Sequence, residues 1–239
     1  MIKSLFLYLV VISVLGSTCK NSVKDKEVKS KPFKFFDPAL ATVPDSFKYL
    51  LPILDTSFLN DQKYRSTSGI ENSKKQAILD SVNLSIVKKI INKYGLLGIK
   101  DVGFVGKTAL HSVLLHSNIA TKKEYYPVLL EAVSKYKATF GDLAIFEDKL
   151  NFQLHRRQYY GTQLTKFKGL MMPYPIEDVD VIDSLRKIMK IGSMDNYLYP
   201  LLKTRWDISI YKKEQAEMVK NFKVNDSTPI RADVNLLRK

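Results

Sequence analysis

The chain has 239 residues, of which 45% are hydrophobic and 26% charged, and its formal net charge at pH 7 is +14. That length is enough for one domain with a sizeable core and terminal extensions. The single cysteine excludes an internal disulfide. Only 7 of the 38 basic residues are arginines, which argues against sequence-specific nucleic-acid binding, because readers of base edges favour the arginine fork.

The N-terminus has the pattern of a targeting segment. Lys3 precedes an apolar run over residues 5–15, which is interrupted only by Ser13 and is too short to span a bilayer. Small residues then lead directly into Cys19. Residues 1–19 therefore resemble a bacterial lipoprotein signal, in which a lipid on Cys19 would anchor the mature chain to a membrane of the cell envelope. The alternative is ordinary signal-peptide cleavage with Cys19 incidental, and in both cases the mature chain leaves the cytoplasm.

A basic stretch follows this signal. Residues 20–34 contain six lysines and few residues that could enter a core, and Pro32, Pro38 and Pro44 punctuate the segment. We expect residues 20–44 to form a solvated tether near an anionic membrane surface. The excess of lysine could equally be a general feature of composition, since net charge bears on solubility rather than on fold.

Helical periodicity begins at about residue 45. Val87, Ile91 and Tyr94 recur at spacings of four and three, which places them on one helix face, and Gly95 is expected to end that helix. The next apolar segment, around residues 109–115, has little polar face and predicts a buried helix.

Two further helices are predicted before the pattern weakens. The spacing of Thr121 and Glu124 matches a capping box, and Asp142 marks the start of the second helix. No run of alternating residues predicts a strand, and the helical pattern fades after Trp206. We therefore predict an all-α, single-domain array of about five to eight helices over residues 45–206, followed by a C-terminal tail at 207–239.

Adjacent carboxylates on the last predicted helix are the first chemical candidates. Glu147 projects close to one apolar face and Asp148 towards another, so at least one of them is expected to be partly buried. A buried carboxylate needs a cation, hydrogen-bond donors or a raised pKa. The cations that could serve as its partner are Arg65, His116, Arg157 and Arg186.

His116 lies near the end of the buried helix, five residues after His111. This spacing puts the two imidazoles on different faces and is not the i, i+4 spacing that chelates zinc, so we predict no metal site. With Glu147 or Asp148 across the fold, His116 could still form a carboxylate-rich metal site. It could instead cap the helix C-terminus or satisfy a buried carboxylate without a chemical role.

Asp61, Gln62 and Arg65 form a third polar group. Asp61 and Arg65 are one helical turn apart and can form a local ion pair. Alternatively, the guanidinium of Arg65 could bind a carboxylate or phosphate of a ligand. The sequence favours neither interpretation.

The densest polar segment is Arg157-Gln158-Tyr159-Tyr160-Gly161-Thr162-Gln163. Gly161 suits a turn that needs a positive φ, and the backbone amides around it could hold an anion together with Thr162. So many polar groups beside an apolar helix must be satisfied by neighbours, water or a ligand.

These motifs, in their order and spacing, resemble a bacterial domain family of unknown function, from Asp61 to about Tyr197. The family pattern contains Asp-Gln-x-x-Arg, Tyr-Gly, Val-Gly, Gln-His-Ala-Asp, Leu-Ala-x-Leu-x-Asp-Arg and Gln-x-Tyr-Gly-Thr-Gln. The matching positions are Asp61-Gln62-x-x-Arg65, Tyr94-Gly95, Val105-Gly106, His116, Leu143-Ala144-Ile145-Phe146-Glu147-Asp148 and Gln158-Tyr159-Tyr160-Gly161-Thr162-Gln163. The chain departs from the pattern at Ser117-Asn118, which stands where the family has Ala-Asp and weakens an acid–base or metal role there. It also has Lys149 where the family has Arg, which keeps the charge but loses the bidentate fork, and it lacks the Trp-Pro that usually follows the Tyr-Gly element.

We predict that these motifs line one shared polar pocket, formed by Asp61, Gln62, Arg65, His116, Asp148, Gln158, Tyr160, Thr162 and Gln163. The first interpretation is an envelope-anchored binding or interaction module for a small polar ligand or a protein partner. The alternative is a hydrolase-like enzyme in which Asp148 or Glu147 is the general base and His116 an acid or ligand. The sequence contains no nucleophile elbow, P-loop or dinucleotide fingerprint, and it identifies no cofactor.

Overall fold

The computed structural model describes residues 38–67 and 69–238. The predicted signal, Cys19 and most of the predicted tether lie outside these residues. Within them the chain is predominantly helical, which confirms the predicted fold class. None of the described helices combines the length and the apolar character needed to cross a membrane.

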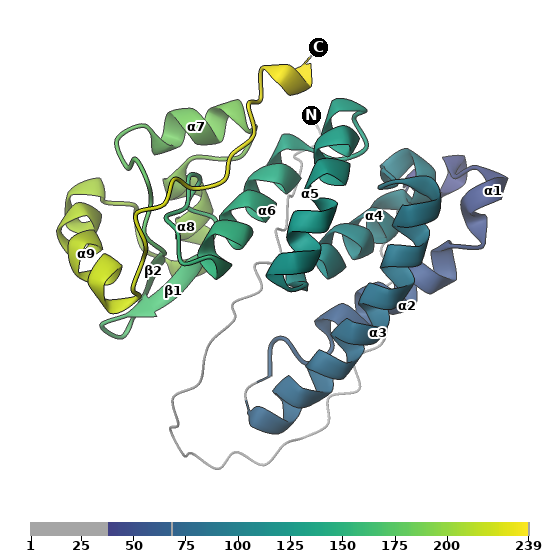
Figure 1. Cartoon of the computed structure of the whole chain (residues 1–239), viewed down its shortest axis with the longest axis horizontal. Helices are drawn as coiled ribbons and strands as arrows, with labels where there is room; N and C mark the ends of the chain where they lie inside the picture. The colour runs from purple at the N-terminus through teal and green to yellow at the C-terminus, as the bar shows by residue number, and fades with distance from the viewer. Residues whose placement is uncertain (1–37, 68, 239) are drawn as a thin grey trace.

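Helices from the first part of the chain form the larger of two packing groups (Figure 1). In chain order they are η1 (Pro38–Thr42), α1 (Asp45–Lys48), α2 (Leu51–Gln62), α3 (Ile70–Tyr94), α4 (Ile99–His116), α5 (Ile119–Ser134) and α6 (Phe140–Gln153). Helix α4 contacts η1 and each of the other five helices, so it is the central element of this group. Leu54, Val87, Leu110, Leu129 and Phe146, one from each of α2 to α6, are almost fully buried in its core.

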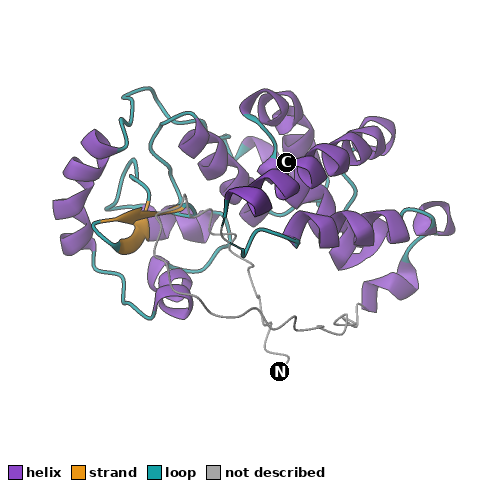
Figure 2. Cartoon of the chain, turned by 90° about the horizontal axis from the view of Figure 1, so that it is seen from below, coloured by secondary structure: helices purple, strands orange, loops and turns teal. Residues whose placement is uncertain are grey.

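A smaller packing group follows in the sequence. It consists of β1 (Leu164–Phe167), β2 (Leu170–Pro173), α7 (Ile182–Ile188), α8 (Met194–Leu202) and α9 (Ile208–Asn221), and the described chain closes with η2 (Leu236–Arg238). Its core contains Phe167, Ile176, Met194, Tyr211 and Met218. Figure 2 shows the two strands at one end of the molecule, with helices around them.

Several predicted helix boundaries follow from local sequence. Helix α3 ends before Gly95, whose φ of 72° is costly for a residue with a side chain. Helix α6 begins before the predicted Asp142, because Thr139 is the N-cap. The Thr139 hydroxyl accepts the Asp142 N–H at 3.0 Å, and the Asp142 carboxylate accepts the Thr139 N–H at 2.8 Å, which completes a capping box.

The capping box predicted at Thr121 is wrong. Helix α5 begins at Ile119 with Asn118 as its N-cap, and the Asn118 side chain accepts the Thr121 N–H at 2.9 Å. An asparagine that caps from three residues upstream places Thr121 inside the first turn. Lys122 is therefore also in that turn, where its side chain is fully buried.

The antiparallel hairpin formed by β1 and β2 was not predicted from the sequence. Leu164 lies opposite Pro173 in the register, and Lys168 and Gly169 form the turn with φ of 47° and 85°. Positive φ at both turn residues is the geometry of tight two-residue hairpins. Strands of four residues are too short for alternation to be recognised in the sequence.

The C-terminal region is not the polar tail that the sequence predicted. It contains α9, whose buried Tyr211 and Met218 are seven residues apart, too sparse a pattern to reveal a helix. Residues 225–237, which we call the C-terminal strap, then return across the larger packing group (Figure 1). The Asn151 side chain on α6 accepts the Ile230 N–H at 2.7 Å and donates to the Ile230 carbonyl at 2.9 Å, so the strap is held through its backbone.

Candidate functional site

The structure divides the nine predicted pocket residues into two clusters instead of one shared pocket. Asp61, Gln62, Arg65 and His116 belong to the first, and Asp148, Gln158, Tyr160, Thr162 and Gln163 to the second. Among the described residues, no hydrogen bond or ion pair joins the two. The reason is that α2 and α4 bring the first set together, whereas the second set surrounds the end of α6 and the loop that follows it.

The first group, which we call the Asp61 cluster, is centred on a carboxylate with no solvent exposure. Asp61 Oδ1 lies 2.8 Å from His116 Nδ1 and accepts a hydrogen bond from Arg65 Nη2 at 2.7 Å. Gln62 Nε2 donates to Asp61 Oδ2 at 2.5 Å. Arg65 Nη2 also lies 2.6 Å from Asp80 Oδ1 on α3. The cluster therefore ties α2, α3 and the end of α4 together through charged hydrogen bonds.

Asp80 and Gln76 are members of this cluster that the sequence analysis missed. Gln76 Nε2 donates to Asp80 Oδ1 at 2.7 Å and to the Asn60 carbonyl at 3.1 Å, and Gln76 Oε1 accepts the Tyr64 N–H at 2.9 Å. The one available signal was that Gln76 and Asp80 stand one turn apart on a predicted helix. Nothing in the sequence indicated that this turn faces the end of α2.

The protonation states within the cluster follow from burial and from its charges. Burial opposes ionisation of Asp61, but the hydrogen bonds and charges of His116 and Arg65 outweigh it and hold the pKa of this carboxyl below its ordinary value. Burial lowers the pKa of His116, and the adjacent Asp61 carboxylate only partly opposes this effect. Asp61 is therefore ionised and His116 neutral near pH 7.

These states fix the tautomer of His116. An ionised carboxylate can only accept hydrogen bonds, so the hydrogen of the neutral ring lies on Nδ1 and points at Asp61. Nε2 of His116 then carries a free electron pair. A carboxylate that orients a neutral imidazole in this way is the arrangement by which histidine becomes a proton acceptor.

A pocket of about 230 Å³ opens beside this pair. Its walls come from α2, α3 and the corner between α4 and α5, and they consist of Asp61, Asp80, Ser81, Leu84, Val113, His116, Ser117 and Asn118. Most of these side chains are polar, and the side chains of Asp61 and His116 are 1% and 10% exposed. Buried polar groups that line a pocket with perturbed pKa values are a recognised mark of a functional site.

The second group, the Asp148 cluster, differs from the first because its carboxylate accepts most of its hydrogen bonds from backbone N–H groups. Asp148 is completely buried and accepts the N–H groups of Tyr159, Tyr160 and Thr162 at 2.9 to 3.2 Å. It also accepts the Thr162 hydroxyl at 2.9 Å. Gly161 provides the turn between these donors with a φ of 65°, as predicted. The anion cradled by this loop is thus Asp148 itself.

The two glutamines of this segment bond within the loop that follows α6 and to the residues that flank the hairpin. Gln158 Nε2 donates to the carbonyls of Tyr174 and Gln163 at 2.7 and 3.0 Å, and Gln158 Oε1 accepts the Gln163 N–H at 2.8 Å. Gln163 Nε2 donates to the Thr162 hydroxyl at 3.1 Å. These bonds connect the end of α6 to the hairpin, so the role of this segment in the structure is to hold two packing groups together.

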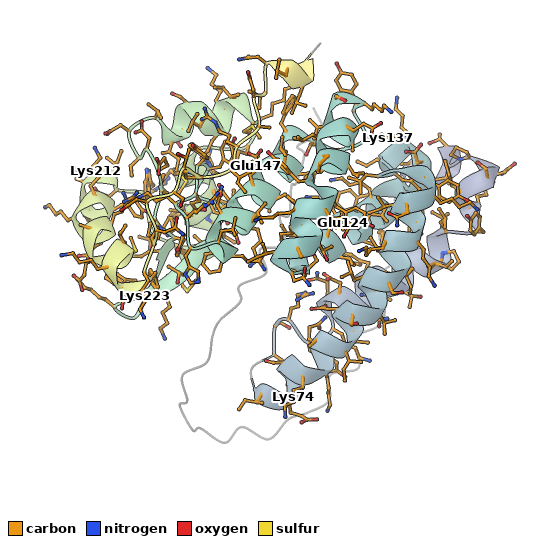
Figure 3. All side chains as sticks on the ribbon, viewed as in Figure 1. Lys74, Glu124, Lys137, Glu147, Lys212 and Lys223 are labelled. Atoms are coloured by element: carbon orange, nitrogen blue, oxygen red, sulfur yellow. The ribbon has the colours of Figure 1, made fainter. Side chains whose placement is uncertain are left out.

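Glu147 lies in the interior on α6, whereas Lys74, Lys137, Lys212 and Lys223 lie at the periphery of the molecule (Figure 3). It accepts the Tyr126 hydroxyl at 2.5 Å and the Ala232 N–H of the C-terminal strap at 2.7 Å through Oε1, and the Tyr160 hydroxyl at 3.2 Å through Oε2. Hydroxyl and backbone groups donate to both buried carboxylates, which is one of the three kinds of compensation that the sequence left open. His116, one of the expected partners, pairs with Asp61.

A second pocket, of about 490 Å³, lies between the C-terminal strap and α7. Tyr160 is the one predicted site residue that lines it, beside Leu185, Met189 and strap residues 231–235. A buried carboxylate paired with a histidine lies at the smaller pocket, so we place the candidate site there. Within the described ranges, no three histidine, cysteine, aspartate or glutamate side chains are grouped as a metal site.

Burial raises the pKa of Glu147 to about 7, against the hydrogen bonds from Tyr126 and Ala232. From pH 4.5, its usual value, to about 7, the folded state retains a proton that the unfolded state has lost, so stability falls as pH rises. The Glu147→Gln variant should lack this pH dependence. Its free energy of unfolding should therefore fall by about 3 kcal/mol less than that of the wild type over this range. Denaturant unfolding at a series of pH values measures the difference.

The matched control is Glu131→Gln, which removes an exposed glutamate that pairs with Lys135 on α5. Its free energy of unfolding should follow pH as the wild type does. Parallel curves for Glu147→Gln and wild type would contradict the assignment of a neutral Glu147 below pH 7.

No family model, no curated protein and no solved structure matches the chain. The resemblance of its motifs to a domain family stays a prediction, and the argument for function rests on the geometry of the Asp61 cluster.

Proposed function

We propose that the protein is a binding module that takes up a small polar ligand in the pocket beside Asp61 and His116. The observation that carries this proposal is that Asp61, Asp80 and His116, from three different helices, converge on one polar pocket. Ionisable groups around an open space contribute little to the stability of a fold, since apolar residues of similar size would fill that space at a lower cost in free energy.

The size and lining of the pocket indicate the kind of ligand. A volume of about 230 Å³ is below the range of most drug-sized sites, which favours a compact molecule. Asp80 and the free electron pair of His116 Nε2 accept hydrogen bonds, and the Ser81 hydroxyl can donate or accept. The Ser117 hydroxyl already donates to the Leu114 carbonyl at 2.7 Å and is left to accept. A ligand with several hydroxyl or amino groups fits this set of partners.

A second candidate function is proton abstraction from such a ligand, or from a water molecule that attacks it. The specific observation that favours it is the 2.8 Å contact between His116 Nδ1 and Asp61 Oδ1, which orients a neutral imidazole with Nε2 free. The sequence analysis expected Asp148 or Glu147 as the general base, but those carboxylates are occupied by backbone and hydroxyl donors. In this reading His116 is the general base and Asp61 its positioning residue.

We further propose that the protein is exported and anchored through a lipid on Cys19, with the helical domain outside the cytoplasm. The N-terminal pattern of Lys3, an apolar run and small residues before Cys19 supports this location. The partner implied is the membrane surface, and the lysine-rich stretch that follows would favour an anionic one. Nucleic-acid binding is not part of the proposal.

The ligand proposal is tested by thermal unfolding of the full-length protein in a panel of amino acids, sugars and small hydroxy acids. A compound that binds the folded state should raise its stability by about 2.7 kcal/mol at a hundredfold excess over its Kd. Asp80→Asn and His116→Gln should weaken that binding about tenfold or more, because each removes a charge-assisted or imidazole contact.

Glu71→Gln is the control, since it removes a carboxylate from α3 that pairs with Lys75 and lies outside the pocket. Hits that bind all three variants equally would contradict the proposed site. A ligand that is bound but not consumed by His116→Gln, and is consumed by wild type, would establish the second candidate function.

The location is tested by cell fractionation. Wild type should sediment with membranes, and Cys19→Ala should move to the soluble fraction because it lacks the acceptor for the lipid. Ser22→Ala, a neighbouring substitution that keeps the cysteine, should behave as wild type. Membrane association that persists in Cys19→Ala would overturn the lipid-anchor proposal.

A further inference from the structure

The larger pocket, of about 490 Å³, is separate from the proposed ligand site and has a different lining. Residues 231–235 of the C-terminal strap form one wall, and α7 with its C-cap residue forms another (Figure 1). Tyr160 completes the lining. The volume lies within the range of small-molecule sites, whose walls are mainly apolar with a few polar groups that orient the ligand.

Most of this lining is apolar. Leu185, Ile188 and Met189 line the pocket on the side of α7, and Ala232 and Val234 line it on the side of the strap. Met189 is 1% exposed and Ile188 is 40% exposed, so the apolar surface extends from the core to the solvent. A ligand with an apolar body would cover this surface, and the removal of apolar area from water would favour its binding.

The strap wall is held through its backbone on both sides of Arg231. Asn151 bonds to the N–H and to the carbonyl of Ile230, at 2.7 and 2.9 Å. Glu147 Oε1 accepts the Ala232 N–H at 2.7 Å. The residues before and after Arg231 are therefore anchored to α6. A wall that is already ordered lowers the entropy cost of binding a ligand.

Arg231 is the only cation among the described residues that line this pocket. Its guanidinium lies over the Tyr159 ring, 4.6 Å from the centroid, a contact that orients the side chain through its face and leaves the N–H groups at its edge. Within the described part of the chain Arg231 forms no ion pair with a carboxylate, whereas Arg157 and Arg205 do. An oriented guanidinium beside an apolar pocket is suited to bind an anionic group of a ligand.

The one carboxylate in the lining favours a ligand with a single negative charge. Asp233 Oδ1 accepts the Asn235 N–H at 2.9 Å, so this side chain bonds within its own turn. The lining thus contains one group of each sign, Arg231 and Asp233. A doubly charged phosphate would exceed the charge of the one guanidinium, whereas a carboxylate matches both its charge and its paired donors. A cationic ligand would meet repulsion from Arg231.

We propose that this pocket binds a small carboxylate ligand with an apolar body, which lies against α7 and the strap while the carboxylate bonds to the guanidinium of Arg231. The inference goes beyond the proposed function, because no residue lines both this pocket and the pocket beside Asp61. It assigns the protein a second binding site with a different class of ligand.

The experiment titrates hexanoate and the neutral hexanamide into full-length protein whose methionine methyl groups carry ¹³C, at constant ionic strength maintained with chloride. The Met189 methyl resonance should shift in a saturable manner because Met189 lines the pocket. The resonance of Met218, buried in the smaller packing group, should not shift. Hexanoate should bind about five- to tenfold more tightly than hexanamide, since its hydrogen bonds to Arg231 are between opposite charges.

The length of the apolar body provides a second comparison. Butanoate has the same carboxylate and two CH₂ groups fewer, so it should bind about tenfold more weakly than hexanoate. Ile188→Ala removes part of the apolar wall and should weaken hexanoate and hexanamide alike, by about threefold or more.

Arg231→Gln separates the charge from the apolar contacts. This variant should bind hexanoate and hexanamide equally, with its affinity for hexanamide within about threefold of the wild type. Arg205→Gln is the matched control, because Arg205 also lies over a tyrosine ring, 4.2 Å from the Tyr199 centroid, and does not line the pocket. It should leave the affinity for both ligands unchanged.

Two results overturn the proposal. The first is the absence of a saturable Met189 shift with hexanoate in the wild type. The second is a preference for hexanoate that is as large in Arg231→Gln as in the wild type. Neither result bears on the pocket beside Asp61, since the test of that pocket uses Asp80→Asn and His116→Gln.

Discussion

Full burial of carboxylate groups is the constraint on which the rest of the structure depends. Asp61, Glu147 and Asp148 have no solvent exposure, and each would be untenable without donors arranged around it. On α6 these donors come from distant parts of the chain. Asp148 accepts hydrogen bonds from the loop at 159–162. Glu147 accepts them from Tyr126, Tyr160 and the C-terminal strap. The smaller packing group and the strap are thereby fixed to the helical core.

The three carboxylates differ in the groups that surround them. Asp148 accepts four hydrogen-bond donors at the rim of a loop that closes over it. Two of the three side chains that bond to Asp61 also reach other groups, since Arg65 bonds to Asp80 and His116 lines a pocket. The Asp61 cluster therefore borders an open pocket, whereas Asp148 is enclosed by its loop. Changes around Asp148 would act on stability first.

The sequence predicted the helical class, the buried helix α4 and the positive φ at Gly161, because periodicity and glycine punctuation are local signals. It failed where the deciding contact was distant. The capping of α5 by Asn118, the clamp of Asn151 on Ile230 and the membership of Asp80 in the Asp61 cluster depend on how helices meet. The order of the motifs suggested a single pocket. The structure instead places these polar residues in two separate clusters, one around Asp61 and one around Asp148. The burial of Lys122 gave no signal, since isolated lysines on helices are normally solvated.

The central claim is that Asp61 is ionised and holds a neutral His116 with its Nε2 free for the pocket. The most direct measurement is the ring nitrogen resonances of His116 in the full-length protein, followed by NMR between about pH 4 and about pH 9. The account predicts the Nδ1–H tautomer and a pKa below 6.5, which falls further in Asp61→Asn because the carboxylate that favours the charged ring is gone. A His116 that carries both protons at neutral pH would contradict it and reduce the pair to a structural ion pair.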